Sequence, residues 1–185
     1  GTAKTYKLSG DYAGNVVYGE GVNGKAVKLG DYGVKLNTQA IGEQYTFAFW
    51  LKPNAVIANY SPLFALGIGV ENGSEDWIAL SGNEAGSLRL WSNDKIGGTT
   101  SWTGIDANIT YEVDEWQQYI LSVDKGAVVL YKDGVQVAAG NLSPTAYNRP
   151  SSDICLGVNA WDEIANVWVD NVAVYNRALT AKEAV

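Results

Sequence analysis

The sequence predicts an all-β protein, a two-sheet antiparallel β-sandwich of the jelly-roll kind. Glycine, asparagine, aspartate and serine interrupt the chain about every eight to twelve residues, and runs rich in valine, isoleucine, leucine, tyrosine and tryptophan lie between them. Helix signals are almost absent, apart from the end of the chain, where Thr180 can cap a short turn over residues 181–184. The pattern therefore favours many short strands.

Ten runs are expected to form strands: residues 26–29, 45–52, 63–69, 76–81, 87–92, 117–124, 127–132, 135–140, 154–158 and 166–175. Asp133 and Gly134 stand between two of these runs, and such a pair accepts the positive φ angles of a tight hairpin turn. No linker or clear internal repeat is evident, so residues 1–185 are interpreted as a single domain. The chain has no methionine and no signal peptide, and we expect it to be a module excised from a larger protein.

Composition excludes several classes of function. Apolar residues make up 46% of the chain and charged residues 18%, which is typical of a folded globular protein. The net charge of −7 and the absence of a basic stripe argue against nucleic-acid binding, and no apolar run approaches a membrane span of about 18 residues. We expect a soluble monomer. Cys155 is the single cysteine, so it cannot form an intrachain disulfide, and its apolar setting predicts a buried thiol.

Strand alternation assigns side chains to faces. Leu88 and Leu90 share one face of their run, which turns Arg89 and Trp91 to the other. The same reasoning places Ile78 and Leu80 in the core and leaves Trp77 and Ala79 opposite. In the later strands, Tyr119, Leu121 and Val123 face inward. If these strands share a sheet, its outer face carries Trp77, Arg89, Trp91, Gln118 and Asn159.

The seven tryptophans fall into two groups. Four lie among polar residues that suit a surface for stacking against a sugar ring: Trp77, Trp91, Trp102 and Trp161. Trp102 and Trp161 are placed on loops that could wall a groove. Trp50 has apolar neighbours and is expected in the core, and Trp116 and Trp168 are interpreted as packing residues. A tryptophan offers about 150–250 Å² of surface, so half-covering one contributes roughly 2–3 kcal/mol.

Several segments together resemble the laminin G-like, concanavalin A-like jelly rolls that occur as carbohydrate-binding and adhesion modules in bacterial secreted enzymes. They are residues 21–29 (GVNGKAVKL), 45–53 (YTFAFWLKP), 116–119 (WQQY), 130–134 (LYKDG) and 169–180 (VDNVAVYNRALT). The resemblance implies two stacked sheets, often a structural calcium ion, and a glycan or protein ligand on the concave face or edge loops. The chain departs from the family at Gln117 and Gln118, where family members usually have histidines.

The resemblance also implies a candidate calcium site. It pairs a loop such as Asp11-Tyr12-Ala13-Gly14-Asn15 with an acid at Asp170, and calcium prefers oxygen ligands of these kinds. The alternative is that Asp11 and Asn15 simply form an Asx turn. Zinc is not expected, because the chain lacks histidine and has one cysteine.

Catalytic residues are not evident. The carboxylate pairs Glu75-Asp76 and Asp162-Glu163 are each adjacent in sequence, and adjacent residues on a strand point to opposite faces. A Ser-His-Asp or Cys-His arrangement is impossible without histidine. We therefore do not expect an enzyme.

These observations predict a non-catalytic module that binds a plant cell-wall polysaccharide such as β-galactan, arabinan or a xylan-type polymer. Its tryptophans would stack on sugar rings, Arg89, Gln118 and Asn159 would contact hydroxyl groups, and an attached glycoside hydrolase would gain local substrate. We expect the parent protein to be secreted. The alternatives are an adhesion or protein-interaction domain and a catalytic jelly roll with two facing carboxylates.

Overall fold

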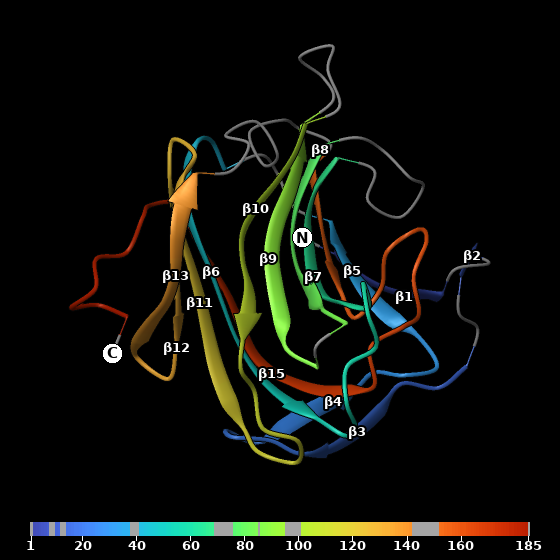
Figure 1. Ribbon diagram of the computed structural model, residues 1–185. Coiled ribbons are helices and arrows are strands. Elements are labelled where there is room, and N and C mark those ends of the chain that lie inside the picture. The colour runs from blue at the N-terminus through green and yellow to red at the C-terminus, as the bar shows by residue number, and fades with distance from the viewer. Residues whose placement is uncertain are drawn as a thin grey trace.

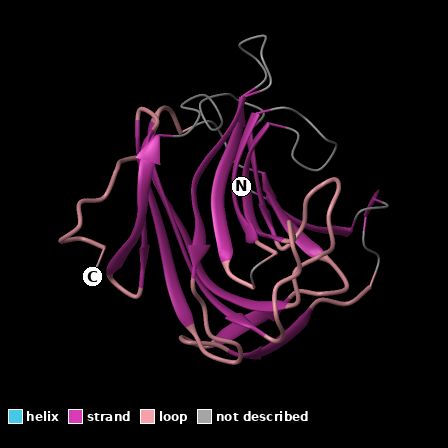
Figure 2. Cartoon of the chain, in the orientation of Figure 1, coloured by secondary structure: helices cyan, strands magenta, loops and turns pink. Residues whose placement is uncertain are grey.

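Two antiparallel sheets lie face to face in the computed structural model (Figure 1). The structure describes residues 2–7, 10–11, 14–37, 41–68, 76–84, 86–94, 101–141 and 152–184. Within these ranges Figure 2 shows strands, loops and turns but no helix. None of the described segments is a helix long and apolar enough to cross a membrane.

The larger sheet has eight strands and the smaller has seven. The order in the eight-stranded sheet is β10 (Ser101–Ile109), β9 (Leu88–Asp94), β8 (Asp76–Gly82), β7 (Pro62–Ile68), β14 (Ser152–Leu156), β5 (Gly33–Asn37), β1 (Thr2–Lys7) and β2 (Gly10–Asp11). The order in the seven-stranded sheet is β13 (Val135–Asn141), β12 (Ala127–Lys132), β11 (Gln117–Asp124), β6 (Gln44–Pro53), β15 (Val167–Tyr175), β4 (Lys25–Lys28) and β3 (Val17–Glu20). The predicted all-β antiparallel sandwich is confirmed.

All ten runs expected to be strands are strands, and five further strands were not predicted. The additional strands are β1, β2, β3, β5 and β10. They are short or rich in polar residues and glycine, so their alternation is weak. Strand β10 also pairs irregularly with β9, with register shifts after Gly104 and Asp106.

The core lies between the two sheets and is built around aromatic rings. Phe64 of β7 meets Phe47 and Phe49 of β6 edge to face, with ring centroids 5.3 and 5.6 Å apart, and Tyr119 of β11 stacks on Phe49 at 5.6 Å. The leucine, isoleucine, tyrosine and valine side chains expected to face inward from β8, β9 and β11 are all in this core. The predicted alternation is therefore confirmed in each of these strands.

The hairpin at Asp133-Gly134 is also confirmed. Both residues have positive φ angles, 50° and 76°, and Lys132 pairs directly with Val135 across a two-residue turn. This turn fixes β12 and β13 as neighbours.

The predicted core placement of Trp50 is wrong, and the strand of Gln118 does not share a sheet with that of Trp91. Trp50 is not a core residue: it lies on the outer face of the seven-stranded sheet and is half-buried, because its neighbours Phe49 and Leu51 take the core positions. Gln118 is on β11 of the seven-stranded sheet, paired with Trp50, and so does not share a face with Trp91. Alternation gave the correct face of each strand, but it does not say to which sheet a strand belongs.

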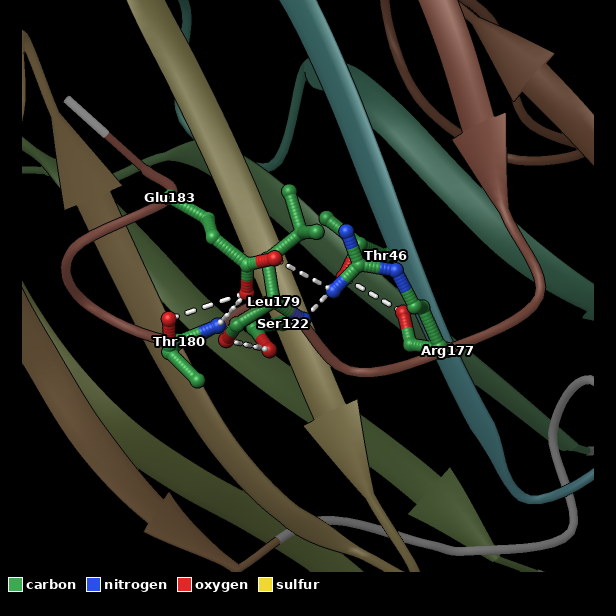
Figure 3. Close-up of polar contacts among 6 residues, drawn as sticks. All are labelled: Thr46, Ser122, Arg177, Leu179, Thr180 and Glu183. Atoms are coloured by element: carbon green, nitrogen blue, oxygen red, sulfur yellow. Dashed lines mark hydrogen bonds and ion pairs between the residues drawn. The ribbon is translucent and has the colours of Figure 1, made fainter.

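Residues 176–184, here called the C-terminal segment, cover part of the outer face of the seven-stranded sheet, at the left of Figure 1. Figure 3 shows how polar contacts hold the segment. The Thr46 hydroxyl donates to the Arg177 carbonyl and accepts from the Leu179 N–H, both at 2.9 Å, and Ser122 donates to the Leu179 carbonyl at 2.8 Å. Ala184 and Leu179 pack beside Ile120 and Tyr131.

The predicted turn at Thr180 is present within the C-terminal segment. The Thr180 N–H and hydroxyl both bond to the Glu183 carboxylate at 2.9 Å, and Arg177 forms an ion pair with the same carboxylate at 2.8 Å. These hydrogen bonds, with the nearby guanidinium, lower the pKa of Glu183. The turn therefore stabilises the C-terminal segment through local contacts.

Candidate functional site

Aromatic side chains gather on the outer face of the eight-stranded sheet, away from the core. Trp77 of β8 and Trp91 of β9 lie on this face, as the alternation predicted, and their rings meet edge to face with centroids 4.8 Å apart. Tyr60, from the loop before β7, approaches Trp91 at 5.7 Å. Trp161, from the loop after β14, approaches Trp77 at 6.5 Å. We call these four residues the aromatic cluster.

The four rings differ in exposure. Trp77 is only 4% exposed and packs against Ala65, Ala79 and Cys155, whose thiol is buried as expected. Tyr60 is 37% exposed and Trp161 is 52% exposed, while Trp91 is half-buried. Trp77 therefore forms the floor of the cluster, and the other three rings offer surface to a ligand.

Arg89 fixes the position of the rings. Its guanidinium lies 4.6 Å from the centroid of Tyr60 and 5.4 Å from that of Trp91, within the range of cation–π attraction. Its Nη2 donates to the side-chain carbonyls of Asn59 and Asn83. Arg89 thus contacts two rings and two amides, and part of its hydrogen-bonding capacity is already used.

The loop that carries Trp161 is shaped by Asn159, which the sequence assigned to ligand contact. The Asn159 carbonyl accepts the N–H groups of Trp161 and Asp162 at 3.0 and 2.8 Å, and its amide donates to the Asp162 carboxylate at 2.7 Å. Partial burial raises the pKa of Asp162, and the hydrogen bond from Asn159 opposes that shift. Asn159 therefore uses both ends of its amide to hold the loop.

A glycine allows the loop of Tyr60 to reach the sheet. Gly82, at the end of β8, donates to the Ser61 carbonyl and accepts from the Tyr60 N–H, each at 3.0 Å. A Cβ at Gly82 would collide with the carbonyl oxygen of Ala58. Ser61 in turn donates to the Glu163 carbonyl at 2.6 Å, so the loops of Tyr60 and Trp161 support one another.

A second glycine leaves space beside Trp91. Gly104 of β10 is the direct cross-strand partner of Trp91 on one side, and Ala79 of β8 is the partner of Trp91 on the other side. Among the described residues, a Cβ at Gly104 would meet no atom within 4 Å. The direct cross-strand neighbours of Trp91 on both sides are thus small residues.

The remaining sequence candidates do not all join the cluster. The backbone of Trp102 lies in strand β10 opposite Asn93, rather than in the loop expected for it, and its side chain lies outside the described parts of the chain. Gln118 is on the other sheet. In the carboxylate pair Glu75-Asp76, Asp76 is fully buried and Glu75 is outside the described residues.

The expected calcium ligands are only partly described. The two oxygens of Asp170 each accept a backbone N–H, from Asn171 at 2.7 Å and from Asn23 at 3.0 Å. Asn15 is exposed, and the side chain of Asp11 lies outside the described residues. The described residues contain no group of three or more His, Cys, Asp or Glu side chains placed to hold a metal. On these residues alone, Asp170 fits the role of a brace for the loop between β3 and β4.

Sequence reasoning missed Tyr60, Asn59 and Asn83. All three lie between predicted strands, in segments that gave no periodic signal. Tyr60 has a φ of 65°, which is uncommon for a residue other than glycine, but a backbone angle cannot be read from the sequence.

Comparisons with known proteins agree with this fold. The family model of the concanavalin A-like lectin/glucanase superfamily matches residues 23–184. Domain 4 of AbnA, a GH43 extracellular arabinanase from Geobacillus stearothermophilus solved in complex with arabinotriose, is similar over 99% of this chain and 85% of that chain, with 25% identity and a TM-score of 0.79. No curated protein sequence matches the chain.

Two further structures resemble the chain in fold alone. The binding domain of botulinum neurotoxin serotype G matches 98% of this chain and 45% of that chain, with 16% identity and a TM-score of 0.61. The sialidase of Trypanosoma rangeli matches 90% of this chain and 27% of that chain, with 18% identity and a TM-score of 0.62. The chain belongs to the concanavalin A-like lectin/glucanase superfamily.

Proposed function

We propose that this protein is a non-catalytic module that binds a neutral plant cell-wall polysaccharide at the aromatic cluster. The observation that carries the proposal is the partly exposed set of Tyr60, Trp91 and Trp161 around the buried floor of Trp77. The apolar faces of sugar rings stack on such side chains, and half-covering one ring contributes roughly 2–3 kcal/mol. Two rings together contribute about 4–6 kcal/mol, which corresponds to a Kd between about 1 mM and tens of μM.

Polar groups at the rim favour a glycan over a protein partner. Asn83 and Asn59 lie beside the rings, and the exposed carboxylate of Glu84 accepts from Asn59 at 3.3 Å. Carboxylate and amide groups next to aromatic faces match a sugar, whose hydroxyls alternate with apolar C–H faces. A protein hot spot would be expected to expose a broader apolar patch.

The similarity to an arabinanase domain solved with arabinotriose supports a pentose or hexose polymer of the cell wall as the ligand class. In this proposal the module is joined to a glycoside hydrolase in a secreted protein, and it keeps that enzyme near its substrate. Lack of catalysis is part of the proposal. Release of reducing ends from arabinan, galactan or xylan by the purified protein would contradict it.

Affinity electrophoresis on gels containing arabinan, β-galactan or xylan tests the site. We expect at least one of these polymers to retard the wild type, and Trp91→Ala to migrate as in a gel without polysaccharide. Trp116→Ala, on the other sheet, is the matched control and should be retarded like the wild type. If both variants lost retardation, or if both kept it, the assignment of binding to the aromatic cluster would be contradicted.

Calcium at Asp11, Asn15 and Asp170 remains a proposal with its own test. If calcium ties these residues together, a chelator should lower the Tm of the wild type but not that of Asp170→Asn. An unchanged Tm of the wild type would remove calcium from the account, and Asp170 would act only through its two backbone hydrogen bonds.

A further inference from the structure

The outer face of the seven-stranded sheet carries a second surface, in the half that the C-terminal segment leaves open. Lys28 of β4 pairs with Trp168 of β15, which pairs with Lys52 of β6. Trp116 directly precedes β11 and continues this register, with the Lys52 ammonium 5.7 Å from its ring centroid. These four residues form a lysine–tryptophan row across the strands. Trp50, also on this face, stands beside it.

Trp168 packs against strand β3. A Cβ at Gly19 of β3 would come within 2.5–3.3 Å of three carbons of its six-membered ring, so the ring lies directly over that glycine. The side chain is partly exposed to solvent. A partly exposed indole offers surface on which a sugar ring can stack.

The lysines of the row are available for a ligand. Lys28 is exposed and Lys52 half-exposed, and within the described ranges neither ammonium lies within ion-pair distance of an acidic side chain. Asp170, an acid on the same face, is 8% exposed and already accepts two backbone N–H groups. Two lysines without an acidic partner, one on each side of Trp168, mark a local site for anions in a chain of net charge −7.

We propose that the lysine–tryptophan row binds an anionic polysaccharide. Trp168 and Trp116 stack on sugar rings, and Lys28 and Lys52 pair with the carboxylate or sulfate groups that those sugars carry. Strands lie about 4.8 Å apart, so the two tryptophans of the row stand about 10 Å from one another with a lysine between them. That spacing suits a chain of linked sugars with charges at intervals. Nucleic-acid binding depends on clusters of Lys and Arg that neutralise several phosphates, and this row offers two lysines.

This second site is independent of the aromatic cluster, so the two can be tested separately. Affinity electrophoresis would use polygalacturonate, its fully methyl-esterified form, and chondroitin sulfate. We expect polygalacturonate or chondroitin sulfate to retard the wild type at an ionic strength of about 0.01 M but not at about 1 M, where the Debye length is about 3 Å. The esterified polymer, which keeps the sugar chain without its charge, should not retard it.

Four variants assign the binding to the row. Each of Lys28→Gln and Lys52→Gln should weaken binding of the polyanion about two- to fivefold, the usual size for an exposed ion pair, and Trp168→Leu should weaken it about tenfold or more. Lys182→Gln removes the same charge from the C-terminal segment and should bind like the wild type. Thermal melts of all four show whether the fold is kept.

Several outcomes would overturn the proposal. The proposal fails if neither polyanion retards the wild type, or if the esterified polymer retards it as much as polygalacturonate does. It also fails if the Lys28→Gln/Lys52→Gln double variant binds the polyanion as tightly as the wild type, or if a single-stranded DNA oligonucleotide binds as tightly as the polyanion. Trp91→Ala should keep its affinity for the polyanion. A Trp91→Ala protein that lost polyanion binding would move that ligand to the aromatic cluster, leaving the proposed function intact.

Discussion

The two outer faces of the sandwich use the same kinds of residue in different ways. On the eight-stranded sheet the cation is committed: Arg89 is held by two rings and two amides. On the seven-stranded sheet Lys28 and Lys52 have no acidic partner among the described residues and flank Trp168. A committed cation orders its aromatic neighbours, whereas an uncommitted one can meet a charged ligand. The comparison suggests that the first face selects sugars by shape and the second by charge.

The largest expected effect is on binding affinity, when a variant of each face is tested with the ligands of both faces. Trp91→Ala should lose about 2–3 kcal/mol of binding to a neutral cell-wall glycan, because it removes the ring at the centre of the aromatic cluster. Trp168→Leu should leave this affinity unchanged and reduce binding to polygalacturonate or chondroitin sulfate. Titration calorimetry of both variants with both kinds of ligand measures the difference. Two variants that lose both ligands equally would mean that the faces are not separate sites.

The space beside Trp91 can be filled from the neighbouring strand. A side chain at position 104 stands about 4.5–5.5 Å from that of Trp91, measured between Cβ atoms, and nothing in the described structure obstructs it. Gly104→Tyr should therefore cover the indole and weaken neutral glycan binding about tenfold, or about 1.4 kcal/mol. Gly104→Ala is the matched control, since its methyl group meets no atom of the described residues within 4 Å. Equal affinity of the tyrosine variant and the wild type would mean that the ligand does not use this side of Trp91.

Strand alternation explains how much of these faces could be predicted. It placed Trp77, Arg89 and Trp91 correctly, because leucine and isoleucine alternate with them and take the core positions. It failed for Trp50, whose run is apolar on both faces since Ala48 lies under the C-terminal segment. It also joined Gln118 to Trp91, because pairing between strands distant in sequence leaves no mark in either strand.

Breaks in strand alternation and contacts between loops could not be predicted either, because they also depend on tertiary structure. Gly157 has a φ of 72° and interrupts the alternation, so Val158 packs with Cys155 and Trp77 instead of following Ile154 and Leu156. Tyr60 reaches Trp91 only because Gly82 lets its loop approach the sheet. Trp116 and Trp168 are half-exposed on one surface because their strands are linked through β6, a tertiary arrangement with no local signature.

The covered half of the seven-stranded sheet offers a contrast with its open half. Thr46 is fully buried and makes two hydrogen bonds to the C-terminal segment, so Thr46→Val should cost about 1–3 kcal/mol by leaving backbone groups unpaired. A chain of this size loses about 2–4 °C of Tm per kcal/mol. Thr110→Val, at an exposed position, is the control and should not change Tm. An unchanged Tm for Thr46→Val would show that the segment contributes nothing to the stability of this face.

The smallest expected effect concerns the loop that presents Trp161. Burial raises the pKa of Asp162 in the folded protein, so the folded state binds its proton more tightly than the unfolded state does. Stability should therefore fall as the pH rises from the ordinary pKa of an aspartate through the raised value, and return as the pH falls. Asp162→Asn keeps an acceptor for Asn159 and cannot titrate, so its advantage in Tm over the wild type should be larger at neutral pH than at about pH 3. Melting curves at the two pH values measure this difference, and an advantage that shrinks as the pH rises would show that Asp162 is stabilised as the anion. That result would mean that the hydrogen bond from Asn159 outweighs burial and that the loop holds Trp161 more firmly at neutral pH.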